Sequence, residues 1–219
     1  MAARGASREQ WALLALATAF AVFHHVPALA GESAGDWIDL ATPFAVAAAA
    51  AVSLATLGGG VWPIALAVLA GVLYVDGHGI HLAANSIGHE ELSGEAERVT
   101  HFWDEPFSHH EWHLGLIALL AAICLAEQLS GRPPGKPRSL AVMVVTAVLL
   151  GFTLFTSTVE GGTWWLALAG AVVFAAWAWK ERRPLVLTCA AAFGVAAILI
   201  GAYAIWQGGV PQFTDAGLF

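Results

Sequence analysis

Charged residues are scarce in this sequence of 219 residues. Asp, Glu, Lys and Arg together make up 11% of the chain, whereas hydrophobic residues make up 58%. About a quarter of the residues in a soluble domain are charged. So few charges cannot cover a water-exposed surface, and the sequence therefore predicts an integral membrane protein that forms a single domain over residues 1–219.

Basic residues and cysteines are also few. Nine Lys and Arg stand against sixteen Asp and Glu, which gives a net charge of -7 and no basic stripe for a nucleic-acid partner. The lysines are Lys136 and Lys180, both at cytoplasmic ends of the spans, so we do not expect a retinal photoreceptor, which needs a Schiff-base lysine inside a span. The two cysteines, Cys124 and Cys189, lie inside apolar runs without a CxxC motif, and we expect small core residues there.

Long apolar runs are what the sequence has in abundance. Each is close to the roughly 20 residues that a helix needs to cross a bilayer. Turn-like stretches such as "GESAGD", "SGRPPGKPRS" and "KERRP" separate them. The sequence thus predicts an all-α bundle of seven transmembrane helices, at about 11–30, 37–57, 62–89, 105–127, 139–158, 163–180 and 184–206.

The basic residues indicate the direction of the chain. With seven spans, all of them except Arg98 fall on one side, which is typical of the cytoplasmic side. We therefore expect a cytoplasmic N-terminus and an outer C-terminus, in a plasma (inner) membrane. The residues on the cytoplasmic side are Arg4, Arg8, Arg132, Lys136, Arg138, Lys180, Arg182 and Arg183.

Two further features concern the ends of the spans. Ala28-Leu29-Ala30 before Gly31 resembles a signal-peptidase site, and cleavage there would leave six spans in the same orientation. We expect residues 1–30 to be retained as a span. Most tryptophans lie near the ends of the runs, where interfacial aromatic belts form. These are Trp11, Trp37, Trp62, Trp103, Trp112, Trp164, Trp165 and Trp206.

The histidines are all predicted on the outer side, in the outer half of a span or in an outer loop at about 90–104. At a rise of 1.5 Å per residue, polar groups of three spans share a slab about 21 to 27 Å from the cytoplasmic ends. Ionisable groups inside a membrane are costly and usually face a partner or a cavity. The groups in this slab are His24, Asp76, His78, His109 and His113.

Helical spacing places several of these groups on common faces. Tyr74, His78, His81 and Asn85 follow one another at intervals of 4, 3 and 4 residues, which makes one stripe of a helix. The next span opens with "WDEPFSHHEWHLG", in which Asp104 is predicted as the N-cap and Pro106 is tolerated in the first turn.

In that next span, Glu105, His109 and His113 stand at i, i+4 and i+8 and form a second stripe, whereas His110 and Glu111 point elsewhere. If the two stripes face each other, they offer four imidazoles and a carboxylate to one or two metal ions. The predicted ligands are His78, His81, His109, His113 and Glu105, and the further candidates are His24, His25, Asn85 and Asp104. Zinc fits this set best, and iron or copper also accept imidazole ligands. The alternative is a water-filled vestibule in which the histidines only form hydrogen bonds.

Other polar residues carry weaker expectations. Asp76 lies about 200° around the helix from His78, so it would reach another helix or support a ligand from behind. His89 and His101, in the outer loop, are weaker candidates for ligands. His110 is expected at the rim, and Glu160 is expected as a solvated loop acid.

The depth of the predicted site coincides with the ester and amide bonds of lipids. A zinc-dependent hydrolase of a lipid or amphiphile is the leading hypothesis, with Glu105 or Asp76 as general base. The architecture is similar in kind to the seven-helix alkaline ceramidase and progestin-receptor-like membrane hydrolases. Those proteins have a late HxxxH motif, whereas no histidine follows His113 here, so no residue role is carried over.

Three alternatives remain open at this point. "HGIH" and "HHEWH" loosely resemble the histidine boxes of membrane desaturases and hydroxylases, which implies an iron or copper oxidase. A metal transporter or chaperone would need a polar path through the inner halves of the spans, and these are almost wholly apolar. A haem protein would use only two axial histidines. The sequence gives no oligomeric state.

Overall fold

The structure is a computed structural model that describes residues 6–30, 32–58, 60–88, 92–131, 133, 135 and 137–218. Over these residues all regular elements are helical, which confirms the predicted all-α class. The predicted spans match the long helices to within a few residues at most ends. The elements are α1 (Arg8–His25), α2 (Pro27–Ala30), α3 (Glu32–Leu57), α4 (Val61–Gly88), α5 (Glu95–Phe102), η1 (Trp103–Ser108), α6 (His109–Leu129), α7 (Leu140–Glu160), α8 (Trp164–Glu181) and α9 (Pro184–Gln207).

Five helices are long and apolar enough to cross a membrane, by length and composition. They are Trp37–Leu57, Val61–Gly88, Glu95–Leu129, Leu140–Glu160 and Pro184–Gln207. The two other predicted spans correspond to α1 and α8, which have 18 residues each. Histidines or charged residues at the ends of α1 and α8 lower their hydropathy. The structure is therefore consistent with a membrane protein and supports five of the seven predicted spans.

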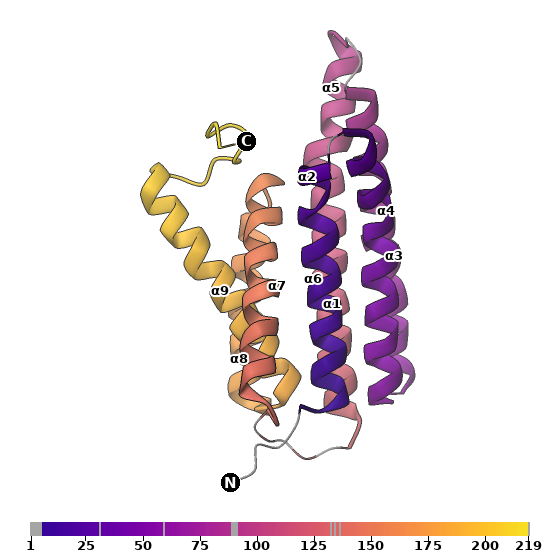
Figure 1. The fold of residues 1–219 in the computed structure, drawn as a ribbon, viewed down its shortest axis with the longest axis vertical. Coiled ribbons are helices and arrows are strands. Elements are labelled where there is room, and N and C mark those ends of the chain that lie inside the picture. The colour runs from indigo at the N-terminus through magenta and orange to yellow at the C-terminus, as the bar shows by residue number, and fades with distance from the viewer. Residues whose placement is uncertain are drawn as a thin grey trace.

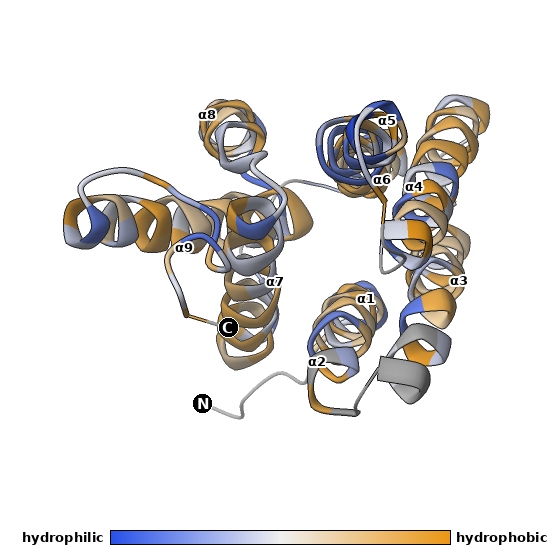
Figure 2. Ribbon diagram, turned by 90° about the horizontal axis from the view of Figure 1, so that it is seen from above, coloured by the Kyte–Doolittle hydropathy of each residue, from blue (hydrophilic) through white to orange (hydrophobic). Residues whose placement is uncertain are grey.

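The long helices form two adjoining groups. In one, α3 packs against α1, α4 and α6, and α4 packs against α6. In the other, α9 packs against α7 and α8. Contacts of α1 with α7 and of α6 with α9 join the groups. Figures 1 and 2 show how the helices are arranged. Successive long helices alternate in direction, so α1 begins and α9 ends at opposite ends of the bundle (Figure 1). We call the end at which α9 finishes the distal end.

Two glycines bring α4 and α6 into backbone contact. A Cβ atom on Gly115 would lie 2.5 Å from the backbone nitrogen of Tyr74, and one on Gly77 would lie 2.6 Å from that of Trp112. Only residues without a side chain allow helices to approach so closely. The stripe that begins at Tyr74 therefore faces α6, as its spacing predicts, and both Tyr74 and His78 are buried.

The segment before α6 differs from the prediction. Residues predicted as an outer loop form α5, which continues through η1 into α6, so that Glu95–Leu129 is one continuous helix. Asp104 is consequently not an N-cap, and that prediction was wrong. The six residues of η1 adopt a π-helix with Pro106 inside. The wider turn accommodates a residue that has no N–H to donate, so the proline does not end the helix.

Buried side chains fix the opposite, proximal end of the bundle. The Glu127 carboxylate of α6 accepts hydrogen bonds from the backbone N–H of Leu185, at 3.0 and 3.2 Å, and so caps α9. Gln10 donates to the carbonyl oxygen of Ser139 at 2.9 Å and ties α1 to the start of α7. Cys124 and Cys189 are buried free thiols with their sulfur atoms 3.7 Å apart, which confirms their predicted place in the core.

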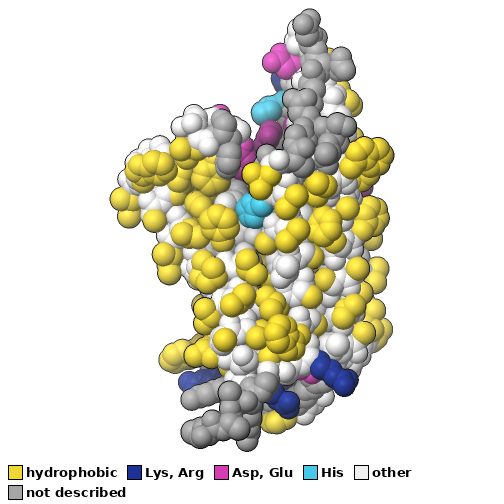
Figure 3. Space-filling model, viewed as in Figure 1, with side chains coloured by type: hydrophobic (Ala, Val, Ile, Leu, Met, Phe, Trp, Pro, Cys, Tyr) yellow, Lys and Arg dark blue, Asp and Glu magenta, His cyan; other side chains and the backbone are white. Residues whose placement is uncertain are grey.

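Large hydrophobic side chains cover much of the outer surface (Figure 3). Trp11, Trp37, Trp62 and Trp206 are 55 to 74% exposed, which fits the predicted interfacial belts. Trp112 is the exception at 3% exposed, so its assignment to a belt was wrong. Its indole lies inside the bundle among the histidines.

Candidate functional site

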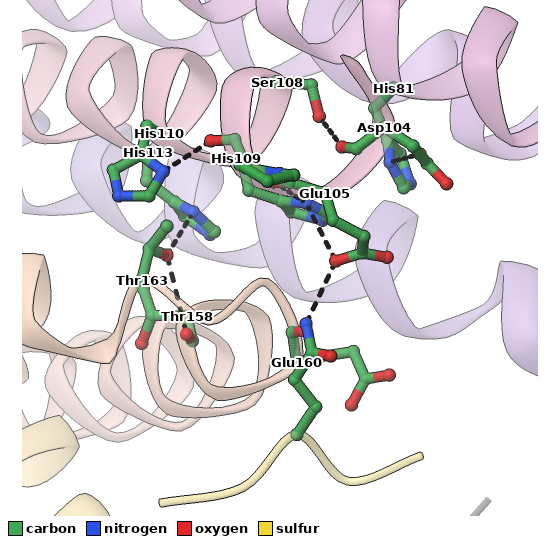
Figure 4. A network of polar contacts seen from close by, with 12 residues as sticks. His81, Asp104, Glu105, Ser108, His109, His110, His113, Thr158, Glu160 and Thr163 are labelled. Atoms are coloured by element: carbon green, nitrogen blue, oxygen red, sulfur yellow. Dashed lines mark hydrogen bonds and ion pairs between the residues drawn. The ribbon is translucent and has the colours of Figure 1, made fainter. Parts of the chain in front are cut away.

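Histidines and carboxylates from five elements meet toward the distal end of the bundle. We call this group the histidine cluster. Figure 4 shows the part of it formed by α4, η1 and α6, together with the segments that cover it. The cluster comprises His24 and His25 of α1, Asp39 of α3, His78 and His81 of α4, Asp104 and Glu105 of η1, and His109 and His113 of α6.

One interaction of the cluster joins α4 to α3. Nε2 of His78 lies 3.0 Å from Oδ1 of Asp39 and 3.0 Å from its backbone oxygen. The hydroxyl of Thr42 lies 3.3 Å from the same Asp39 carboxylate oxygen and donates to the carbonyl oxygen of Phe23 in α1. Three helices thus hold one imidazole, with its Nδ1 atom buried and without a hydrogen-bond partner among the described residues.

His81 and His109 lie next to each other across the α4–α6 contact, with their ring planes tilted by 58°. Their ring centroids are 4.6 Å apart. Nδ1 of His81 and Oδ1 of Asp104 form an ion pair at 2.8 Å (Figure 4). Nδ1 of His109 hydrogen-bonds to the backbone oxygen of Glu105 at 3.0 Å and lies 3.5 Å from that residue's carboxylate. Each imidazole therefore has a carboxylate at its side.

His113 lies one helical turn further along α6 and is completely buried. Its Nδ1 atom hydrogen-bonds to the hydroxyl of Thr163, at 2.8 Å, just before α8 (Figure 4). Nε2 of His113 is buried and has no hydrogen-bond partner within the part of the chain that the structure describes. The sequence of α7 and α8 gave no sign of this contact, because Thr163 stands in a turn-like stretch.

Trp112 occupies the middle of the cluster. Its ring stacks on His113 with centroids 4.0 Å apart, and the rings of His24, His78 and His109 lie within 6.0 Å of it. The histidines on α1, α4 and α6 therefore surround an indole. Among the described residues, no three His, Cys, Asp or Glu side chains are arranged to hold a metal ion.

The histidines of α1 complete the cluster on the side of α7. The rings of His24 and His25 are 5.1 Å apart. Nε2 of His25 lies 3.4 Å from the hydroxyl of Thr153 in α7. His24 thus faces Trp112, whereas His25 connects the two groups of helices.

The C-terminal segment covers the outer side of the cluster. Gln212 donates from its side-chain amide to the Glu105 carboxylate at 3.0 Å and to the backbone oxygen of Glu160 at 2.5 Å. The Glu160 carboxylate accepts from the N–H groups of Phe213 and Thr214, at 2.8 and 3.3 Å. Glu160 is thus tied to this segment, not a freely solvated loop acid. Acidic and histidine side chains gather in the notch beside this segment in Figure 3.

Several predicted residues lie outside this arrangement. Asp76 is exposed and lines an apolar groove with Gly79 and Ile80 on the far face of α4. Asn85 lines a separate pocket beyond Asp104. His110 lies at the rim, as predicted, next to Trp165 with ring centroids 5.6 Å apart. His89 falls outside the described residues.

Asp39 is the residue that sequence reasoning missed most clearly. It stands inside the second predicted span, where an ionisable residue is a signal of function by itself. Its partner His78 is 39 positions away, and no periodicity within one helix connects the two. Comparison with protein-family models, with curated proteins and with solved structures finds no match to this chain.

Proposed function

We propose that this protein is a membrane-embedded, metal-dependent hydrolase that acts on an ester or amide bond of a lipid or other amphiphile. The observation that carries the proposal is the pair His81 and His109, 4.6 Å apart between ring centroids and flanked by two carboxylates. Two imidazoles and a carboxylate are a common ligand set of catalytic zinc. Zinc is therefore the first metal to test.

The remaining histidines support the proposal through their orientation. A metal-binding histidine usually has its second ring nitrogen held by a carboxylate, a carbonyl or another polar group. Asp39 holds His78 in this way and Thr163 holds His113, and each of these imidazoles keeps a buried nitrogen without a hydrogen-bond partner in the described structure. Such atoms are costly unless an ion or a water molecule satisfies them.

A third ligand requires a local movement. Glu105 is held by Gln212 in the present arrangement. If its side chain turned from Gln212 toward His81 and His109, two imidazoles and one carboxylate would converge. If the Trp112 side chain rotated away from the middle of the cluster, His78 and His113 could also reach a metal ion there.

The chemistry follows from these residues. A metal held by His81 and His109 would supply a water molecule of lowered pKa and would polarise the substrate carbonyl. Asp104 or Glu105, the carboxylates of η1, would take a proton from the water that attacks the carbonyl carbon. The bond from that carbon to the ester oxygen or amide nitrogen would break, and the same carboxylate would return the proton to the leaving group. The products are a carboxylic acid and an alcohol or amine.

The seven-span topology belongs to the same proposal. With α1 and α8 crossing the membrane beside the five longer candidates, the N-terminus is cytoplasmic and the histidine cluster opens to the outer side of a plasma membrane. The proximal end is then cytoplasmic, and positively charged residues concentrate on the cytoplasmic side of membrane proteins. The arginines at this end are Arg8, Arg138, Arg182 and Arg183.

Metal content is the first test. The protein is purified without chelators, and its metals are measured by inductively coupled plasma mass spectrometry beside an absorption spectrum. We expect one or two equivalents of zinc and no visible band. The double variant His81→Ala/His109→Ala should lose the metal, and the rim variant His110→Ala should retain it. Equal metal content in parent and double variant overturns the site, and iron with a visible band overturns the hydrolase assignment.

Activity is the second test. The zinc-loaded protein, in nanodiscs, is given a fluorescent ceramide analogue and a fluorescent phosphatidylcholine, and release of the labelled fatty acid is followed. We expect hydrolysis of one of them that depends on zinc and is lost in Glu105→Gln. Hydrolysis that continues unchanged in the double histidine variant would show that the activity arises elsewhere.

A further inference from the structure

A polar cavity lies next to the histidine cluster, beyond Asp104. It has a volume of about 320 Å³ and is formed where the end of α4 meets α5. No Lys or Arg occurs among its lining residues in the described part of the chain. The lining residues are Asn85, Gly88, Leu92, Glu97, Thr100, His101 and Asp104.

The charge of this cavity is negative. Glu97 and Asp104 contribute carboxylates, and Asn85, Thr100 and His101 contribute further polar groups that can form hydrogen bonds. The nearest arginine in sequence, Arg98, is exposed and forms an ion pair with Glu95. The two carboxylates would repel an anion here, whereas an ammonium group or a hydroxyl would find acceptors.

Exposed aromatic side chains near the cavity suit a membrane surface. Val99, Phe102, Trp103 and Phe107, on the same helical segment, are 37 to 49% exposed. The rings of Trp103 and Phe107 are 4.8 Å apart and form an exposed aromatic group. Exposed aromatic side chains of this kind settle at the lipid–water interface. With these aromatic side chains at the interface, the cavity would lie at the depth of the head of an amphiphile.

Asp104 connects the cavity to the histidine cluster. Its side chain lines the cavity, and its Oδ1 atom lies 2.8 Å from Nδ1 of His81. A head group bound beside Glu97 and His101 would therefore place the adjoining bond of the same molecule near His81 and His109.

From these observations we infer that this cavity is a head-group site for an amphiphile that carries a primary amine or hydroxyl head and no phosphate. Naming this amphiphile as the substrate rests on the proposed hydrolase function. The binding site itself does not require the metal, so the two can be tested separately.

The test uses photoreactive probes on the whole protein. Two probes with the same diazirine-bearing twelve-carbon chain, one an amine and one a phosphate, are added to the protein in phosphatidylcholine nanodiscs with EDTA present. After irradiation, the labelled peptides are identified by mass spectrometry. We expect the amine to label residues 85–104 and the phosphate not to label them.

Glu97→Gln and Glu95→Gln form a matched pair of variants. Both glutamates are exposed and lie on α5, and the two substitutions change the net charge equally. Only Glu97 lines the cavity. We expect Glu97→Gln to lower amine labelling about fivefold, the worth of one partly exposed ionic contact, and Glu95→Gln to leave it unchanged. Equal labelling by both probes, or an equal effect of both substitutions, overturns the site.

The outcomes separate this inference from the proposed function. If the amine labels the protein selectively but the protein binds no zinc, the head-group site is supported and the hydrolase function is contradicted. If zinc-dependent hydrolysis occurs without selective labelling of residues 85–104, only the head-group site is contradicted.

Discussion

A Cβ atom on Gly77 would lie 2.6 Å from the backbone nitrogen of Trp112 and 2.9 Å from the backbone oxygen of Ser108. Backbone atoms of α6 cannot yield as a flexible side chain can, so α4 and α6 must separate to admit even one methyl group. Gly77 adjoins His78, and Ser108 adjoins His109. Together with Gly115, this glycine therefore sets the distance between the two histidine-bearing stripes.

The first prediction is that Gly77→Ala destabilises the bundle. Forced separation of a tightly packed contact costs about 1–3 kcal/mol. We expect a lower midpoint of thermal unfolding in detergent, followed by circular dichroism, and a loss of bound metal.

The control for this prediction is Gly79→Ala, two residues further along α4. A Cβ atom on Gly79 would meet no atom within 4 Å. Alanine is a better helix former than glycine by about 1 kcal/mol, so this variant should be as stable as the parent or slightly more stable. If both alanine variants unfold at the temperature of the parent, the close α4–α6 contact is not what sets the geometry of the cluster.

The second prediction concerns Asp39, which holds His78 at 3.0 Å. Asp39→Asn keeps the shape of the side chain and removes its charge. Loss of a carboxylate behind a metal-binding histidine typically lowers metal affinity about 10- to 100-fold. We expect a weaker zinc affinity of this size in competition titrations with a chromophoric chelator.

Asp76→Asn is the matched control for Asp39→Asn. Asp76 is also an aspartate inside a candidate span, but it lies exposed on the other face of α4. Its substitution should leave zinc affinity within twofold of that of the parent. An equal effect of the two substitutions would mean that the overall charge of the distal end matters, and not the contact with His78.

Periodicity within single helices could be read from the sequence. The intervals that join Tyr74, His78 and His81 correctly indicated a face of α4 turned toward the bundle, and those of His109 and His113 did the same for α6. Which helices face each other across such stripes is decided by packing between distant segments. For this reason Asp39 and Thr163 could not be assigned as partners.

Two of the errors in the sequence-based predictions, those on Asp104 and Trp112, have local physical causes. Pro106 after an acidic residue is typical of a helix start, yet η1 absorbs the proline in a π-turn and the helix continues. Trp112 stands near the expected end of a span, where tryptophans usually form belts. The extension of the helix by α5 places Trp112 well inside it, where it is buried among histidines.

The third prediction concerns the cap of α9. The Glu127 carboxylate is the acceptor for the backbone N–H of Leu185. Glu127→Ala leaves that buried donor unsatisfied and should cost about 1–3 kcal/mol in unfolding free energy. Glu127→Gln keeps one acceptor oxygen and should cost less. Unfolding curves in SDS or urea measure both, and equal losses in the two variants would contradict the capping role.

The last prediction concerns the C-terminal segment, which Phe213 and Gln212 hold by different means. Phe213 is buried, with its ring centroid 5.0 Å from that of Tyr203 and 5.4 Å from that of Phe155. Phe213→Ala should cost about 3 kcal/mol of local packing and release the segment, so that carboxypeptidase removes it quickly.

Gln212→Ala removes only hydrogen bonds of about 1 kcal/mol each and should leave the segment protected while freeing Glu105. Leu218→Ala, at a 42% exposed position, is the control and should digest like the parent. A protected C-terminus in Phe213→Ala would show that other contacts hold the segment over the cluster.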